Sequence, residues 1–255
     1  MNRIVKFVIL DILRNKIVLF YTLILAVLSW SVFNLEDNST KGILSLLNVI
    51  LLTVPLVSVI FSCIYLYNSA EFIELMLSQP IKRTKIWFCL FIGLVFSFVL
   101  SFVIGAGLPL LVYAPFDVGL IMILVGVFIT AIFVALAFLS SVFTRDKAKG
   151  IGIAIMLWLF FALLFDGMVL FLLFQFSDYP IEKLMVVLSA LNPIDLSRIL
   201  ILMHLDVSAM MGYTGAIFKH FFGTNLAISI VFVILLLWTI VPFLISLIKF
   251  KRRDL

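Results

Sequence analysis

Charged residues are scarce in this chain: Asp, Glu, Lys and Arg together make up 12% of its 255 residues, against 65% hydrophobic residues. A water-soluble globule must cover its surface with polar side chains, so this balance excludes a soluble enzyme and a soluble nucleic-acid-binding protein. The charges occur in short clusters, and the uncharged runs between them are long enough to cross a bilayer, which takes about 20 helical residues. The composition therefore predicts an all-α polytopic membrane protein.

Cysteine is also scarce, and the motifs of catalysis are missing. Cys63 and Cys89 lie inside apolar runs without a CxxC pair, so we expect both to pack as small hydrophobic side chains. The sequence contains no GxxxxGK[ST], HExxH or GxSxG motif, and no GxGxxG opens a helix after a strand. These absences predict a non-catalytic chain that cannot hydrolyse ATP alone and that carries no cofactor.

Six apolar runs predict six transmembrane helices. In chain order these runs cover residues 17–35, 43–67, 87–112, 120–143, 151–174 and 226–248. Of the 18 Lys and Arg residues, 14 lie on the side that holds both termini and four on the other side. Basic residues concentrate in cytoplasmic connections, so both termini are predicted to be cytoplasmic. The basic balance then reflects orientation and contact with anionic membrane lipid, and it predicts no nucleic-acid partner.

The leading segment, 1–16, predicts an interfacial helix. At helical spacing its charged and polar side chains occupy about half of the circumference, although Phe7 and Leu10 interrupt that face. Such a helix would lie on the cytoplasmic surface of the membrane before the first span. The alternative is a simple extension of the first span into the cytoplasm.

The connection 68–86, which reads NSAEFIELMLSQPIKRTKI, predicts a second short helix. Ser69 can cap its start, and Glu71 favours the positive N-terminal end of the helix dipole. Pro80 is expected to end the helix after Gln79.

This short helix is predicted to have an apolar face made of Phe72, Leu75 and Met76. A helix held close to the membrane would expose that face to water unless something covers it. A partner protein is the economical cover, and the lipid headgroup layer is the alternative.

The outside stretch 175–225 is too long for a turn and too apolar for a disordered loop. Asn192, Pro193 and Asp195 form a helix start, with a cap, a first-turn proline and an acidic third position, leading into residues 196–205. This pattern predicts helices that dip partway into the outer leaflet.

Asp166 is the only ionisable residue placed clearly inside a predicted span, and no Lys or Arg lies within a span to pair with it. An acid at membrane depth is costly, so we expect it to face a cavity, to be neutralised or to find hydrogen-bond donors, and it is a functional candidate. Alternatively, Asp166-Gly167 breaks the span and the acid caps the helix that follows.

Methionine and histidine gather in the outside stretch, and thioether and imidazole groups are ligands that copper(I) favours. The residues are Met203, His204, Met210, Met211 and His220. Their spacing fits no defined ligand pattern, so we predict no metal site.

Residues 71–83, EFIELMLSQPIKR, resemble the cytoplasmic connection after the second span of type-2 ABC transporter permeases. In that family a leucine-rich coupling helix ends in a Ser-x-Pro-x-x-Arg-like turn and docks on an ATP-binding subunit. The resemblance extends over the six spans and implies a single permease domain, 1–255, in a bacterial inner membrane. The ATPase-docking residues that it implies are Ser69, Glu71, Phe72, Leu75, Met76, Gln79, Pro80 and Arg83. The Gly-Thr pair often found just before the coupling helix is absent here.

Two outside stretches carry a narrower resemblance. Residues 192–198 (NPIDLSR) and 211–223 (MGYTGAIFKHFFG) resemble the permeases of ABC transporters that serve maturation of nitrous-oxide reductase, an enzyme of denitrification. This resemblance implies a periplasmic partner protein and a role in assembling the copper centres of that enzyme. The partner contacts that it implies are Asn192, Asp195, Arg198, Tyr213 and Phe218.

We therefore predict an ABC permease that pairs with an identical copy and binds two ATP-binding subunits, coupling ATP hydrolysis to transport or to remodelling of a periplasmic partner. One alternative is an ABC exporter permease for lipid, drug or gliding motility, which would share the coupling helix. A secondary transporter should show inverted repeats and several buried ionisable groups, and the sequence offers only Asp166. An intramembrane enzyme using Asp166 would lack a second catalytic group.

Overall fold

The computed structural model describes residues 2–36, 38–176, 182–205 and 225–252. Within these ranges the chain forms helices and no strand, which confirms the predicted all-α class.

Six helical stretches of the described chain are long and apolar enough to cross a membrane, which confirms the predicted number of spans. They cover Lys16–Leu35, Ser39–Asn68, Arg83–Tyr113, Phe116–Phe143, Lys147–Gln175 and Ile228–Arg252. Each end lies within four residues of the predicted one. Hydropathy alone therefore locates the spans.

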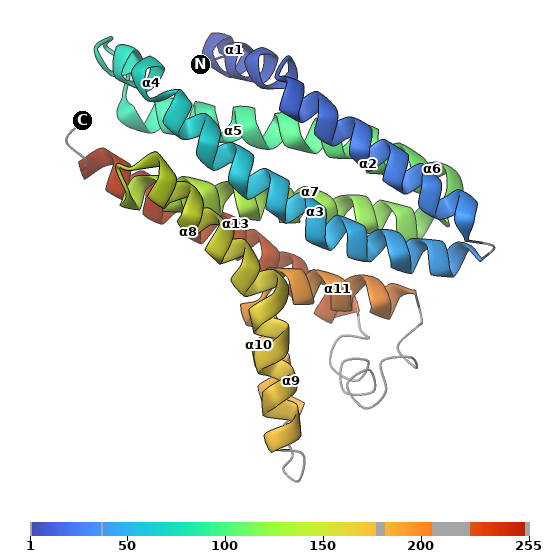
Figure 1. Cartoon of the computed structure of the whole chain (residues 1–255). Helices are drawn as coiled ribbons and strands as arrows, with labels where there is room; N and C mark the ends of the chain where they lie inside the picture. Colours follow the sequence, from blue (N-terminus) through green and yellow to red (C-terminus); the bar gives the residue numbers. More distant parts are fainter. Residues whose placement is uncertain (1, 37, 177–181, 206–224, 253–255) are drawn as a thin grey trace.

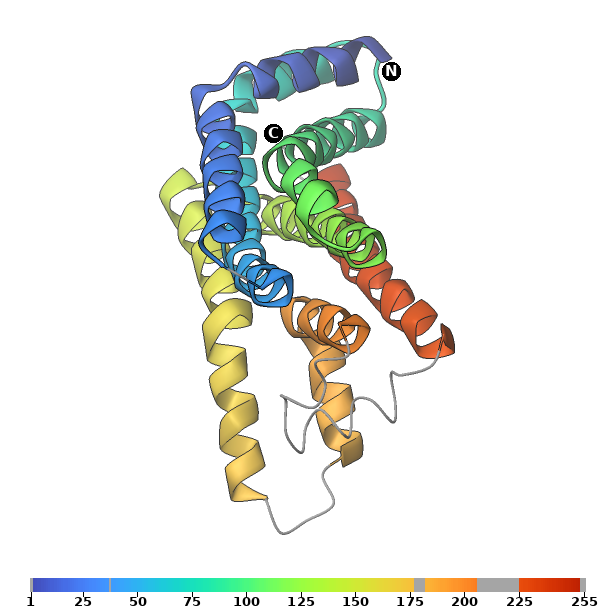
Figure 2. The same cartoon turned by 90° about the vertical axis from the view of Figure 1, so that its right-hand side faces the viewer.

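Both termini lie at one end of the helix bundle, which we call the terminal end (Figure 1). α1 (Asn2–Leu13) lies across this end, and Figure 2 shows it at a steep angle to α2 (Lys16–Leu35). A cap separates the two helices: Asn15 Oδ1 accepts a hydrogen bond from the Ile17 backbone N–H at 3.0 Å. The leading segment is thus a separate helix, and the alternative that it extends the first span is wrong.

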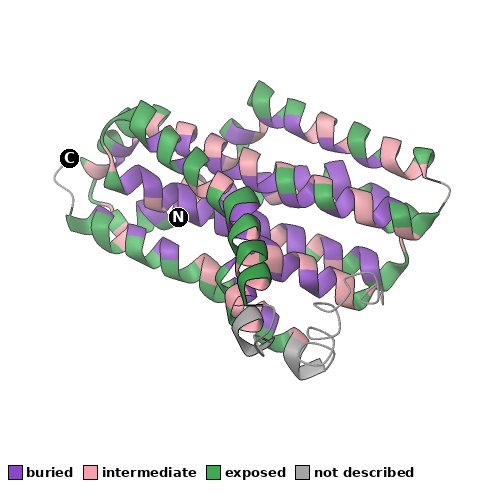
Figure 3. Ribbon diagram, turned by 60° about the horizontal axis from the view of Figure 1, so that its bottom comes forward, coloured by how far each residue is buried: buried purple, intermediate pink, exposed green. Residues whose placement is uncertain are grey.

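The fourth span, α7 (Phe116–Phe143), forms the centre of the bundle. It packs against α3 (Ser39–Asn68), α5 (Arg83–Phe102) and α13 (Asn225–Arg252). Figure 3 shows buried residues concentrated along these central helices. The core is rich in aromatic side chains, and the largest that are fully buried are Phe98, Phe102, Phe133 and Phe138.

Small residues let these rings pack tightly. The Phe102 ring lies directly against Gly126, where an added Cβ would overlap the ring. Cys63 and Cys89 are fully buried free thiols, which confirms that they pack as small hydrophobic side chains.

The third span contains a π-helical turn, which is a turn with one extra residue. The span runs from α5 through η1 (Val103–Gly107) into α6 (Leu108–Tyr113). At Gly105 an added Cβ would stand 2.9 Å from the Thr22 carbonyl oxygen of α2. A side chain at Gly105 would therefore push α2 away from the third span.

The fifth span is bent. It consists of α8 (Lys147–Leu159), η2 (Phe160–Leu164) and α9 (Phe165–Gln175). η2 is a second π-helical turn, a common cause of helix kinks, and Figure 1 shows α9 leaving the bundle beyond it. The alternative in which Asp166-Gly167 breaks the span is wrong, because both residues lie within α9 and the bend precedes them.

Two shorter helices of the described chain precede the last span. α10 (Glu182–Leu191) leads into α11 (Pro193–His204), which packs against α7, α13 and η2. α11 buries Leu196, Leu200 and Ile201 against the bundle. Part of the outside segment is thus built into the core of the protein.

Candidate coupling surface and arginine cluster

The predicted coupling helix is present as α4 (Ala70–Leu77), at the terminal end (Figure 1). Ser69 occupies the N-cap position, but its side chain makes no capping hydrogen bond, so that part of the prediction is wrong. The helix ends at Leu77, two residues before Gln79, because Ser78 closes it: its Oγ donates to the Leu75 carbonyl oxygen at 2.8 Å.

α4 turns its apolar side chains in two directions. Phe72 stacks on Phe7 of α1, with ring centroids 5.4 Å apart, and Ile73 and Met76 are buried. Leu75, by contrast, is 66% exposed. The predicted single face of Phe72, Leu75 and Met76 is therefore wrong, since α1 of the same chain covers Phe72 and Met76 packs into the core.

The outward side of α4 and the turn after it form an exposed surface. We call this the coupling surface and define it as Glu71, Glu74, Leu75, Gln79, Pro80 and Arg83. It combines two acids, one leucine and one arginine. Arg83 also ties the surface to the last span, because its Nη1 donates to the Lys251 carbonyl oxygen at 3.4 Å.

α1 is fixed on the bundle by close packing. Val8 and Ile12 are fully buried, and Val8 lies over Gly93 of α5, where an added Cβ would stand 2.5 Å from Val8 Cγ1. Asp11 accepts a hydrogen bond from the Tyr65 hydroxyl at 3.2 Å. The position of α1 in turn holds Phe7 against the coupling helix.

At the start of α11 the structure confirms the predicted cap. Asn192 Oδ1 accepts from the Ile194 backbone N–H at 3.0 Å, and Pro193 takes the first helical position. Asn192 Nδ2 donates to the Phe161 carbonyl oxygen of η2 at 2.9 Å. Because Asn192 is fully buried, it positions α11, and it is not available for the partner contact that the sequence suggested.

Asp166 has an ion-pair partner that the sequence analysis missed. Arg198 of α11 donates from Nη1 to Asp166 Oδ2 at 3.0 Å and to Asp195 Oδ1 at 3.3 Å. We call these three residues the arginine cluster. The sequence analysis considered only basic residues within the spans, and this arginine comes from α11, outside them. The expectation that the acid finds a donor is confirmed.

A cavity of about 280 Å³ adjoins the arginine cluster, between α3 and the fifth span. Asn48 and Leu51 of α3 line it together with Asp166 and Arg198. Asp166 Oδ1 and Arg198 Nε are buried and have no hydrogen-bond partner within the described residues. Asp166 thus both finds a donor and borders a cavity.

Asp195, the second acid of the arginine cluster, has a raised pKa. Burial, and next the neighbouring Asp166 carboxylate, raise the pKa of Asp195 from 3.8 to about 7, against the opposing effects of Arg198 and Asn192. A single arginine serves two acids here, so one of them can hold a proton near neutral pH.

The remaining predicted contacts of the outside stretch are only partly visible. Tyr213 and Phe218 lie outside the described residues, as do three of the five methionine and histidine residues considered for copper. Met203 packs against the core, and His204 is the last residue of α11. Within the described ranges no group of His, Cys, Asp and Glu could hold a metal ion.

The coupling helix, the last four spans and α11 all lie in a region that matches a known family. Residues 54–255 match the family described as ABC-2 family transporter protein. The chain belongs to this family of ABC transporter permeases. The match confirms the resemblance to type-2 permeases, whose members are membrane subunits that work with an ATP-binding partner subunit.

The permease is also similar to two curated proteins, each named "Probable ABC transporter permease protein NosY". The protein from Stutzerimonas stutzeri is 25% identical over 266 residues, which cover 95% of each chain. The protein from Pseudomonas aeruginosa is 27% identical over 223 residues, which cover 79% of this chain and 81% of the relative. The likeness to NosY thus extends over the coupling surface and the arginine cluster.

Proposed function

We propose that the permease couples ATP hydrolysis by an ATP-binding subunit to rearrangement of its outside segment, in transport or in remodelling of a periplasmic partner. The observation that carries this proposal is the exposed coupling surface on a helix that the rest of the chain holds in place. Its charged and apolar side chains point away from the bundle, where a partner subunit can reach them.

The orientation follows the distribution of charge. With the terminal end in the cytoplasm of a bacterial cell, α1 lies at the inner surface of the inner membrane and the coupling surface faces the ATP-binding subunit. The basic residues of the connections then lie on the cytoplasmic side, as the positive-inside rule requires.

A second copy of the permease completes the assembly, with one ATP-binding subunit for each copy. The fifth span supports this, because only 11% of the residues in its apolar 18-residue stretch are buried within one chain. Gly152, Met156 and Phe160 line a groove of about 690 Å³ on its outer side. A permease that stays a monomer in mild detergent, both alone and with its ATP-binding subunit, would contradict this part of the proposal.

The arginine cluster connects the fifth span to α11 of the outside segment. Asp166 belongs to the fifth span and Arg198 to α11, so a rigid-body movement of the span carries α11 with it. Asp195 and Arg198 remain the proposed contacts with a periplasmic protein, together with Tyr213 and Phe218 beyond the described residues.

The proposed client is nitrous-oxide reductase during assembly of its copper centres. Support comes from the likeness to NosY and from residues 192–198 and 211–223, which carry the narrower resemblance. In the organism that encodes this chain, deletion of the permease should leave the enzyme deficient in copper. Enzyme with full copper content would favour the exporter alternative instead.

The coupling step is tested by charge reversal on the exposed side of α4. Glu71→Arg should lower the amount of ATP-binding subunit that copurifies with the permease about tenfold, because reversing a charge at an interface costs more than 1 kcal/mol. Stimulated ATPase activity should fall in parallel. Glu36→Arg, which reverses an acid just after α2 at the opposite end of the bundle, is the matched control and should leave both unchanged. If Glu71→Arg copurifies with as much ATP-binding subunit as the wild type, α4 does not lie in the interface.

A further inference from the structure

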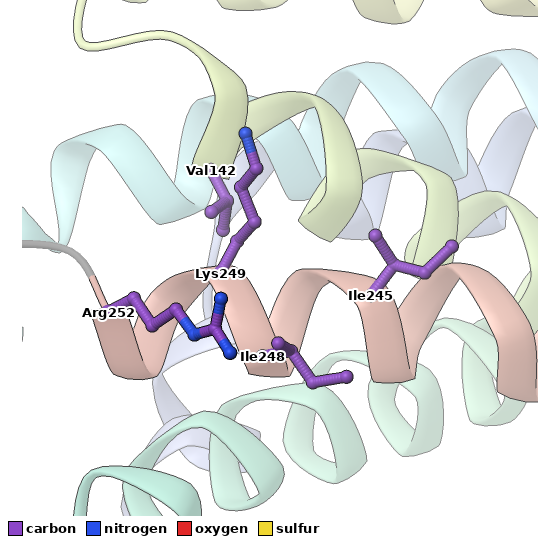
Figure 4. A pocket seen from close by; sticks show the side chains of 5 residues that line it. All are labelled: Val142, Ile245, Ile248, Lys249 and Arg252. Atoms are coloured by element: carbon purple, nitrogen blue, oxygen red, sulfur yellow. The ribbon is translucent and has the colours of Figure 1, made fainter.

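The end of the last span carries a pocket that the coupling function does not use. The pocket has a volume of about 410 Å³ and lies between α7 and α13, where it is lined by Val142, Ile245, Ile248, Lys249 and Arg252. Figure 4 shows Lys249 extending from α13 beside Val142, with Arg252 on the next turn.

The lining residues of α13 form one stripe that changes from apolar to basic. Ile245, Ile248, Lys249 and Arg252 follow the spacing of i, i+3, i+4 and i+7, which places them on one side of a helix. Ile245 and Ile248 are 43% and 51% exposed, so part of the apolar half of the pocket is left uncovered. Lys249 begins about 6 Å along the helix from Ile245, at the membrane end of the span.

Lys249 and Arg252 form the basic half of the pocket. The Lys249 ammonium lies over the Phe143 ring, 4.0 Å from its centroid. Among the described residues, neither Lys249 nor Arg252 forms an ion pair with an acid. Both basic side chains are exposed, so an anionic group at the edge of the membrane can reach them.

We propose that this pocket binds one anionic phospholipid, a role separate from ATP-driven coupling. Arg252 offers a planar fork of donors to the phosphate, and Lys249 adds a point charge. An acyl chain lies along Val142, Ile245 and Ile248, toward the middle of the span. The site differs from a diffuse basic surface because the two cations share a pocket with an apolar wall, and a phospholipid is the membrane component that carries both chemistries.

The test compares lipid binding to the full-length permease in neutral detergent. Bound lipids are counted by native mass spectrometry, and thermal unfolding midpoints are measured with added phosphatidylglycerol or phosphatidylcholine. The wild type should retain and be stabilised by phosphatidylglycerol over phosphatidylcholine. Equal effects of the two lipids would overturn the proposal.

Variants locate the site. Lys249→Gln and Arg252→Gln should each weaken phosphatidylglycerol binding about fivefold, since a basic residue near a membrane surface contributes about 1 kcal/mol. Lys251→Gln is the matched control: it removes a charge from the same turn of α13 without altering the pocket lining, and it should leave binding unchanged. A loss with Lys251→Gln as large as the others would show a diffuse charge effect and refute a site.

Two further arms separate the possible sources of the phosphate and guard against misfolding. Inorganic phosphate and glycerol 3-phosphate should not shift the midpoint, because they lack the acyl chain; a shift equal to that with phosphatidylglycerol would assign the pocket to free phosphate instead. Arg252→Lys keeps the charge and should retain most of the binding. Copurification of the ATP-binding subunit should be unaffected in all these variants, so failure of the lipid site is distinguishable from failure of the coupling proposal.

Discussion

The helices outside the spans are fastened differently at α1 and α4 than at α11. At the terminal end, α1 and α4 are held by apolar contacts: Phe7 stacks on Phe72, and Val8 packs over Gly93. At α11 the apolar packing is joined by polar contacts of Arg198 with Asp166 and of the Asn192 amide. Apolar contacts are non-directional, whereas hydrogen bonds and ion pairs require defined atoms to meet. The first fastening therefore sets how closely a helix approaches, and the second sets its register.

The largest loss of stability is expected from replacing Arg198. Arg198→Gln leaves Asp166 and Asp195 facing each other with one neutral amide between them. Breaking a fully buried ion pair costs about 3–5 kcal/mol, and the side chains of Arg198 and Asp166 are each 31% exposed, so we expect a loss of about 2 kcal/mol in unfolding free energy. Thermal unfolding of the permease in detergent measures it.

A double variant is the control for that loss. Adding Asp166→Asn to Arg198→Gln removes both charges of the pair, so the double variant should lose less than the sum of the two single variants. Strict additivity would mean that the two side chains do not stabilise each other.

The apolar fastening is tested at Gly93. Gly93→Ala places a methyl group against Val8 and should push α1 away from α5, at a cost of about 1.5 kcal/mol, because overpacking strains a core. Gly167→Ala is the matched control, since nothing lies within 4 Å of an added Cβ there. The control should be neutral or slightly stabilising, because alanine is the better helix former. Equal midpoints for the two variants would show that α1 docks without this close contact.

A pH profile distinguishes the two fastenings. Because the pKa of Asp195 is raised from 3.8 to about 7, the folded state binds a proton that the unfolded state has released, and stability falls as pH rises through that window. Asp195→Asn keeps a neutral side chain at every pH, so its unfolding midpoint should fall less between pH 4 and pH 7. Parallel pH profiles of the variant and the wild type would show that Asp195 does not titrate in this range.

Features that depend only on neighbouring residues in the chain were predicted correctly from the sequence. The spans follow from hydropathy, and the start of α11 follows from the cap chemistry of Asn192 and Pro193, so both predictions are confirmed. The two faces of α4 could not be read from its own spacing, because α1 supplies the ring that covers Phe72. The partner of Asp166 lies 32 residues away on a helix that the hydropathy pattern placed outside the spans.

The docking residues remain a prediction, and in the structure some of them are exposed and others are buried. Glu71, Leu75 and Gln79 are exposed and available, whereas Met76 is 9% exposed and holds the helix in place. The sequence could not separate these roles, because contact with a partner and contact with the chain's own core both favour apolar residues. Only the position of the neighbouring helix decides between them.

The π-helical turn η2 makes the arginine cluster sensitive to chain length. One residue of an α-helix advances about 100° around the axis, so deleting a single residue from 160–164 would rotate α9 by about that angle relative to α8. Asp166 would then face away from Arg198, although every side chain of the cluster would still be present. Insertions and deletions in this span are therefore expected to be more damaging than most substitutions, because the cluster depends on the phase of the helix as well as on its composition.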